Sequence, residues 1–203
     1  MKSMSLSAVV VILGLGSLLM GQKKQVEWIP LDQPVPKSAV TAALIGPKSG
    51  ADLLHLSISL PLRDPVGMQQ FVDSVSDPTS PNYRHFATPE EIGARFGLPA
   101  SAVKKVADYL TSQGFKVTLL AKSRQSIAAD ATVAQAQSAF NTTISEFSIV
   151  EPGKTEPDVR FAYNKPPSLP ASIRPLVTYI GGLENIVQPR HGPIRHTIHP
   201  VGG

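Results

Sequence analysis

Alternating apolar and polar residues mark four stretches of the chain as β-strands with one buried face. These are residues 54–60, 115–119, 143–149 and 159–163, and a shorter apolar stretch at 126–129 has the same character. Successive side chains of a strand point to opposite faces, so a period of two indicates a sheet covered on one side. The sequence therefore predicts several half-buried strands.

Two helices are predicted after the first strand. Asp64 offers an N-cap before Pro65, and apolar residues at helical spacing continue to about residue 76. A turn-rich loop with two prolines follows. Thr88, a proline and Glu91 then form the pattern of a capping box, which opens a short helix that ends at Gly97.

Three further helical segments are predicted downstream. Pro99 begins one, and Gly114 stands where a left-handed C-terminal residue is needed. Asp130 or Thr132 can cap the next. The third is a last helix or turn opened by Pro170, with apolar residues at 173, 176, 177 and 180. Strands and helices mixed in this order predict an α+β fold, with helices packed on one face of an antiparallel sheet.

The chain divides into four parts by composition. Residues 1–22 contain one early lysine, an apolar run and small residues near the end, which is typical of a secretory signal peptide. We expect secretion to the extracellular space or the periplasm, and no stable membrane anchor after cleavage. Residues 23–52 are a proline-containing lead-in segment, residues 53–185 form the folded body, and residues 186–203 read as a linker or tail without periodicity.

Composition narrows the function classes. The 203 residues carry a net charge of +4, 17% charged residues and no cysteine. The absence of cysteine excludes disulfides, cysteine-based metal sites and thiol nucleophiles. The net positive charge is too small for a nucleic-acid-binding surface, and the basic tail has no aromatic residues between its charges for base stacking. No nucleic-acid partner is therefore expected.

No familiar catalytic motif occurs in the chain. Glu90 and Glu91 are adjacent on a predicted helix and point about 100° apart, so they do not form an acid–base pair. His191, His196 and His199 are the only histidine cluster, and their spacing fits neither a helix face nor a strand face. We therefore expect no catalytic, cofactor or metal residue.

Three separated blocks resemble a known family. Residues 73–97, with the sequence DSVSDPTSPNYRHFATPEEIGARFG, are similar to the signature of the pro-kumamolisin activation domain, the propeptide of sedolisin-type (family S53) serine peptidases. The second block is residues 133–141, and the third combines residues 166–173, 177 and 181–185. The resemblance implies a ferredoxin-like fold of the kind found in subtilisin propeptides. Catalytic residues and calcium would belong to a downstream catalytic domain, so no cofactor is expected here.

The resemblance also implies a function. Such a domain assists folding of the catalytic domain, blocks its active site, and is removed by proteolysis in acid. The expected partner is a sedolisin catalytic domain in cis or in trans. Two alternatives stay open: a stand-alone secreted inhibitor acting in trans, and an unrelated extracellular binding module.

Two groups of residues are candidates for contact with the peptidase. The first is Tyr83, Arg84, His85 and Phe86; alternatively the two rings anchor the loop into the core and Arg84 forms a structural ion pair. The second is a processing linker whose candidate residues are Arg190, His191, Arg195 and His196. A pH hypothesis accompanies them: protonation of His85 or the tail histidines in acid would loosen the complex.

Overall fold

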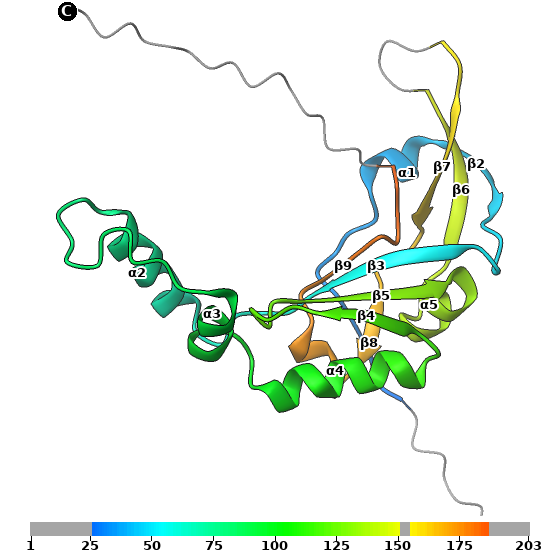
Figure 1. Ribbon diagram of the computed structural model, residues 1–203. Coiled ribbons are helices and arrows are strands. Elements are labelled where there is room, and N and C mark those ends of the chain that lie inside the picture. The colour runs from blue at the N-terminus through cyan, green and yellow to red at the C-terminus, as the bar shows by residue number, and fades with distance from the viewer. Residues whose placement is uncertain (1–25, 151–154, 187–203) are drawn as a thin grey trace, which may run out of the picture.

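The computed structural model describes residues 26–150 and 155–186 (Figure 1). In chain order its elements are β1 (Trp28–Pro30), α1 (Lys37–Thr41), β2 (Ala43–Pro47), β3 (Leu53–Ser59), α2 (Pro65–Ser76), α3 (Pro89–Arg95), α4 (Ala100–Ser112), β4 (Lys116–Leu120), β5 (Ser126–Thr132), α5 (Val133–Ala139), β6 (Ile144–Ile149), β7 (Asp158–Tyr163), β8 (Ser168–Pro170), the 3-10 helix η1 (Arg174–Leu176) and β9 (Tyr179–Gly181). The predicted turn at residues 151–154 lies outside the described residues.

An antiparallel four-stranded sheet with the order β4-β5-β3-β9 forms the centre of the fold. Taken in chain order, β3, β4, β5 and β9 are its first to fourth strands, and helices intervene between the first and second and between the third and fourth. That arrangement is the βαββαβ pattern of a ferredoxin-like sheet. The predicted α+β class with an antiparallel, ferredoxin-like sheet is confirmed.

One face of this sheet forms the core with α4 and α5. The buried residues alternate along the strands, as the period of two requires, and recur every three or four residues along the helices. They include Leu54, Leu56 and Ile58 of β3, Ile127, Ala129 and Ala131 of β5, Val103, Val106 and Leu110 of α4, and Val133, Ala136 and Ala139 of α5. Phe115 and Phe140 close the layer edge to face, with ring centroids 5.5 Å apart.

The described part of the lead-in segment, residues 26–52, is packed onto the body. Strand β1 pairs with β8, and β2 joins the sheet β2-β6-β7. Gln33 is buried, and its side-chain amide donates to the Ile180 carbonyl at 2.9 Å while accepting from the Ile180 amide at 3.0 Å. The hydroxyl of Tyr163 donates to the carbonyl of Pro34 at 2.9 Å. These long-range bonds fix the lead-in to β9 and to the end of β7.

A helical arm, defined as residues 64–97, extends from one end of the sheet (Figure 1). The predicted caps hold its two helices: the Asp64 carboxylate accepts from the Gly67 amide at 2.8 Å, and Thr88 with Glu91 completes the capping box. At the base of the arm, a Cβ on Gly93 would come within 2.4 Å of the Lys122 carbonyl oxygen. Glycine therefore permits the close approach of α3 to the turn between β4 and β5.

Of the two alternatives predicted from Pro170, a helix or a turn, the turn is correct and the helix is wrong. Pro170 ends β8, a short 3-10 turn follows, and residues 179–181 form the edge strand β9. The apolar spacing that suggested a helix is real, because Ile173, Val177 and Ile180 are all buried. A single turn followed by a strand brings them to the same core, and a pattern of four positions cannot separate the two geometries.

The choice of cap before α5 is also resolved. Asp130 lies within β5, and Thr132 is the N-cap, whose side chain accepts from the Gln135 amide at 3.2 Å. Strand β5 is longer than predicted because Asp130 and Ala131, which follow the predicted stretch 126–129, carry little strand signal. Within the described residues, no helix is long and apolar enough to cross a membrane.

Candidate functional site

The second face of the four-stranded sheet carries no helix of the core and is lined by small residues at its centre. Ser57 of β3 stands opposite Ala128 of β5 on one side and Gly181 of β9 on the other. Because these side chains are short, the backbone of the sheet lies close to the molecular surface at this place. We call this surface the open face.

Larger side chains flank the open face on both edge strands. Leu119 of β4 stands opposite Ala128 and is 58% exposed, and Tyr179 of β9 stands opposite Ser59 and is 44% exposed. Partial burial raises the pKa of Tyr179, so the ring keeps its proton well above neutral pH. Exposed large apolar side chains that frame a flat surface are typical of protein contact sites.

One end of the open face is charged. His55 Nδ1 lies 2.7 Å from the Asp130 carboxylate oxygen, and Lys116 stands opposite Asp130 on the edge strand. His55 is far more exposed than Asp130. A partner that covers this end therefore meets a histidine, a carboxylate and a lysine in one row across three strands.

The chain leaves the sheet by a tight turn next to this end of the open face. Gly182 has φ +90, and a Cβ there would lie 2.2 Å from the His55 carbonyl oxygen, so the turn requires glycine. Leu183 is fully buried beyond it. The Asn185 side chain then accepts from the Phe161 amide at 2.7 Å. The chain is held firmly up to the last described residue, Ile186.

The four predicted contact residues lie at the far end of the arm, in the loop between α2 and α3. All four are exposed. Phe86 is 75% exposed and Tyr83 39%, so neither ring is anchored in the core. Arg84 has φ +63, its amide donates to the Val75 carbonyl at 2.9 Å, and its guanidinium lies 5.7 Å from the Tyr83 ring centroid. The loop thus presents these side chains to solvent on an ordered backbone.

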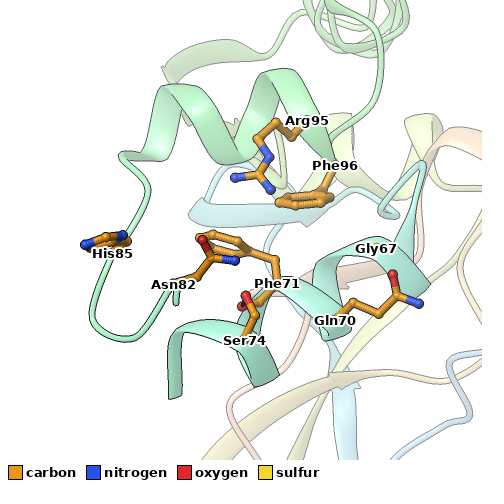
Figure 2. Close-up of a pocket in the computed structure, with 8 residues that line it drawn as sticks. All are labelled: Gly67, Gln70, Phe71, Ser74, Asn82, His85, Arg95 and Phe96. Atoms are coloured by element: carbon orange, nitrogen blue, oxygen red, sulfur yellow. Dashed lines mark hydrogen bonds between the residues drawn. The ribbon is translucent and has the colours of Figure 1, made fainter. Parts of the chain in front are cut away.

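A pocket of about 520 Å³ lies between α2, this loop and α3 (Figure 2). Its lining combines two aromatic rings with polar side chains and one guanidinium: Gly67, Gln70, Phe71, Ser74, Asn82, His85, Arg95 and Phe96. Of the predicted contact residues, only His85 lines it. Phe96 is buried and forms its floor together with Phe71.

Three exposed carboxylates stabilise the local structure of the arm or its base, and each has a pKa below the ordinary value. Hydrogen bonds from the Thr79 amide and hydroxyl lower the pKa of Asp77. Those from Thr88 lower the pKa of Glu91, and the ion pair with Lys122 lowers that of Glu90. Each carboxylate therefore stabilises the arm as an anion.

The second group of candidates, Arg190, His191, Arg195 and His196, lies outside the described residues, as does His199. Within the residues that the structure does describe, no three histidine or acidic side chains are gathered as a metal site. The open face was missed by the sequence reasoning. The polar positions of the alternating strands indicate which residues face away from the core. The sequence does not indicate which strands are neighbours in the sheet, so it could not bring these residues together.

Comparisons with known proteins match the folded body. A family model described as "Pro-kumamolisin, activation domain" matches residues 42–186. Xanthomonalisin from Xanthomonas sp. (strain T-22) is 33% identical over 148 residues, which are 73% of this chain and 16% of the relative. Sedolisin from Pseudomonas sp. (strain 101) is 26% identical over 169 residues, 79% of this chain and 27% of the relative.

A shorter match of 82 residues relates the chain to aorsin from Aspergillus oryzae (strain ATCC 42149 / RIB 40), with 30% identity over 39% of this chain and 13% of the relative. The chain thus spans about a sixth to a quarter of the length of the first two relatives. The family model covers both the sheet and the arm, including all three blocks on which the resemblance was based. The chain belongs to the pro-kumamolisin activation domains, the propeptides of sedolisin-family serine peptidase precursors.

Proposed function

We propose that the chain binds a sedolisin-type catalytic domain through the open face, assists its folding, and inhibits it until proteolysis in acid removes the propeptide. The observation that carries this proposal is the combination of the family match with one uncovered sheet face. The centre of that face, at Ser57, Ala128 and Gly181, is free of bulk, so a helix or loop of the partner can approach the backbone closely.

The exit of the chain supports inhibition in particular. Gly182 and Leu183 fix the chain beside the open face, so a partner docked there lies next to the segment that follows Ile186. In the proposed mechanism that segment, with Arg190 and Arg195, occupies the substrate cleft as an extended strand and is cut on activation. The same arrangement works in cis, within one precursor, and in trans.

Export and acid activation complete the proposal. Residues 1–22 serve as the secretory signal peptide, which delivers the precursor outside the cytoplasm. Acid then weakens the complex, because the tail histidines gain positive charge where they face the peptidase. Replacing His191, His196 and His199 with glutamine is expected to flatten the pH dependence of inhibition, and an unchanged pH profile would exclude this part.

The test is inhibition of the xanthomonalisin catalytic domain by the purified chain. We expect inhibition that saturates at one chain per peptidase, and a higher yield of active peptidase when the denatured catalytic domain is refolded with the chain. Ser57→Arg places a long charged side chain at the centre of the open face and should weaken inhibition at least tenfold. Lys104→Gln, on the outer surface of α4, is the control.

A wild-type chain that neither inhibits nor aids refolding would contradict the proposal. Inhibition that Ser57→Arg leaves unchanged would keep the propeptide role and exclude the open face as the contact. Peptidase activity of the isolated chain in acid would contradict both, because the chain is proposed to act only on a partner.

A further inference from the structure

Arg95, the last residue of α3, has its charged group held by two aromatic rings. Its guanidinium lies 4.5 Å from the Phe71 ring centroid and 4.7 Å from that of Phe96. In the described part of the chain, no carboxylate lies within ion-pairing distance of it. The pKa of Glu91, one turn earlier, is lowered mainly by hydrogen bonds from Thr88, whose amide donates to the carboxylate at 2.7 Å, and to a smaller extent by the charge of Arg95.

Contact with two rings limits the orientations that the guanidinium can adopt. An arginine so held loses less rotamer entropy when it binds an anion than a free surface arginine does. It also keeps its N–H edge available, because cation–π contact uses the face of the planar group and not its edge. Arg95 is therefore a prepared donor without an acceptor in the described structure.

The rest of the pocket adds neutral donors and no acidic side chain. Gln70 and Asn82 contribute side-chain amides, and the imidazole of His85 lies at the outer end of the loop (Figure 2). A fork of guanidinium N–H groups with amide donors beside it fits the planar, two-oxygen geometry of a carboxylate. Phe71 and Phe96 beneath them provide an apolar floor for the methylene groups that carry such a carboxylate.

The surroundings favour a carboxylate attached to a protein. Gln70, Asn82, His85 and Arg95 are all exposed, so the pocket is open to solvent, whereas sites for small molecules enclose most of their ligand. The residue next to His85 is Phe86, the most exposed large apolar side chain of the described residues. An exposed ring beside a charged pocket is the composition of a protein–protein contact.

We propose that the Arg95 pocket binds an aspartate or glutamate side chain of the catalytic domain, with Phe86 packing beside it. This inference rests on the proposed function and adds a second contact to it, at the end of the molecule far from the charged row of the open face. The arm thereby sets partner specificity: a catalytic domain without an acidic residue at that place loses the ion pair and leaves the guanidinium facing an apolar surface.

The test compares inhibition of the xanthomonalisin catalytic domain by single variants of the full chain. Arg95→Gln should raise the inhibition constant at least tenfold and reduce its dependence on salt, because one charge pair is lost. Lys104→Gln removes the same charge from an exposed helix position, where Lys104 pairs with Asp108 at 2.7 Å. It should change the inhibition constant less than twofold.

A second variant separates binding from folding of the arm. Asn82→Asp keeps the size of the side chain and puts a carboxylate inside the pocket, where it neutralises Arg95 without removing the stacked guanidinium. We expect the same direction of change as for Arg95→Gln, with the thermal unfolding midpoint within about 2 °C of wild type. Wild-type inhibition constants in both variants would overturn the Arg95 proposal and leave the proposed function intact. Failure of the wild-type chain to inhibit would instead contradict the proposed function itself.

Discussion

The sheet body and the helical arm are stabilised in different ways. All of the largest fully buried side chains belong to the body, among them Phe140, Ile58 and Leu110. Helix α2 of the arm buries only Val75, and helix α3 only Gly93. The arm is stabilised instead by helix caps, turns and hydrogen bonds. One of these hydrogen bonds runs from the Arg63 guanidinium to the Arg95 carbonyl and is 2.6 Å long.

This difference separates the roles of the two regions. Burial of apolar surface stabilises the body from within, whereas the arm presents exposed rings and a guanidinium that are available for binding. Substitutions in the body should therefore change stability, and substitutions at the arm surface should change binding. Each of the following predictions tests this difference between the body and the arm.

The largest effect is expected for truncation of an aromatic ring in the core. Phe140→Ala removes a side chain that is 1% exposed and packs on Phe115, so it should lower the free energy of unfolding by about 3–5 kcal/mol. Phe86→Ala, at 75% exposure, should stay within about 0.5 kcal/mol of wild type. Urea titration followed by far-UV circular dichroism measures both. Comparable losses for the two variants would remove the distinction between body and arm.

Gly182→Ala is expected to have the next largest effect. The new Cβ would meet the His55 carbonyl oxygen at 2.2 Å, and φ +90 is strained for any residue with a side chain. We expect a loss of about 1–3 kcal/mol in unfolding free energy. Gly46→Ala is the matched control, because no heavy atom lies within 4 Å of the added Cβ there. Equal stability of the two variants would show that the exit turn is not rigid.

Removing one cap from each region compares their local stability. Thr88→Ala in the arm and Thr132→Ala in the body each break a complete capping box, at a cost of about 1 kcal/mol. In the arm the loss should appear as local opening, with faster amide exchange confined to α3. In the body it should appear as lower global stability. Native-state hydrogen exchange with denaturant distinguishes the two, and global unfolding of both variants would contradict the division.

The smallest effect is a local response to acid. Asp77, Glu90 and Glu91 have folded-state pKa values below their ordinary ones, so their contribution is present above the ordinary carboxylate pKa and is lost as pH falls through the lowered values. As pH falls from 5 towards 2, arm amides should lose exchange protection before those of β3 and β5. Glu91→Gln should reduce this dependence at Thr88. Simultaneous loss in the core strands would show that the arm has no separate acid response.

The parts that could be predicted from sequence are those with local causes. Asp64, Thr88 and Glu91 act on neighbours within three residues, and the alternation in residues 54–60 follows from burial of a single face. Strands β1, β8 and β9 have three residues each and exist only through partners far along the chain, such as Ile180 opposite Ile58. No local signal distinguishes such strands from turns, because their stability comes from tertiary contacts.

The candidate contact residues show the same difference between local and long-range causes. Tyr83, Arg84, His85 and Phe86 were identified because they form one continuous segment, and their exposure fits a contact role that is still to be tested. The open face joins Ser57, Ala128 and Gly181, which are distant in sequence and chemically unremarkable. The Arg95 pocket likewise depends on how α2 and α3 approach each other, which the sequence alone does not specify.

The most direct test of the account is hydroxyl-radical footprinting of the full chain, free and bound to the xanthomonalisin catalytic domain. We expect Leu119, Tyr179 and His55 on the open face, together with Phe86 on the arm, to become protected in the complex. Leu44 and Ile45 on β2, which are 63% and 53% exposed, should stay as reactive as in the free chain. A complex that protects the β2 residues and leaves the open face and Phe86 reactive would contradict the account.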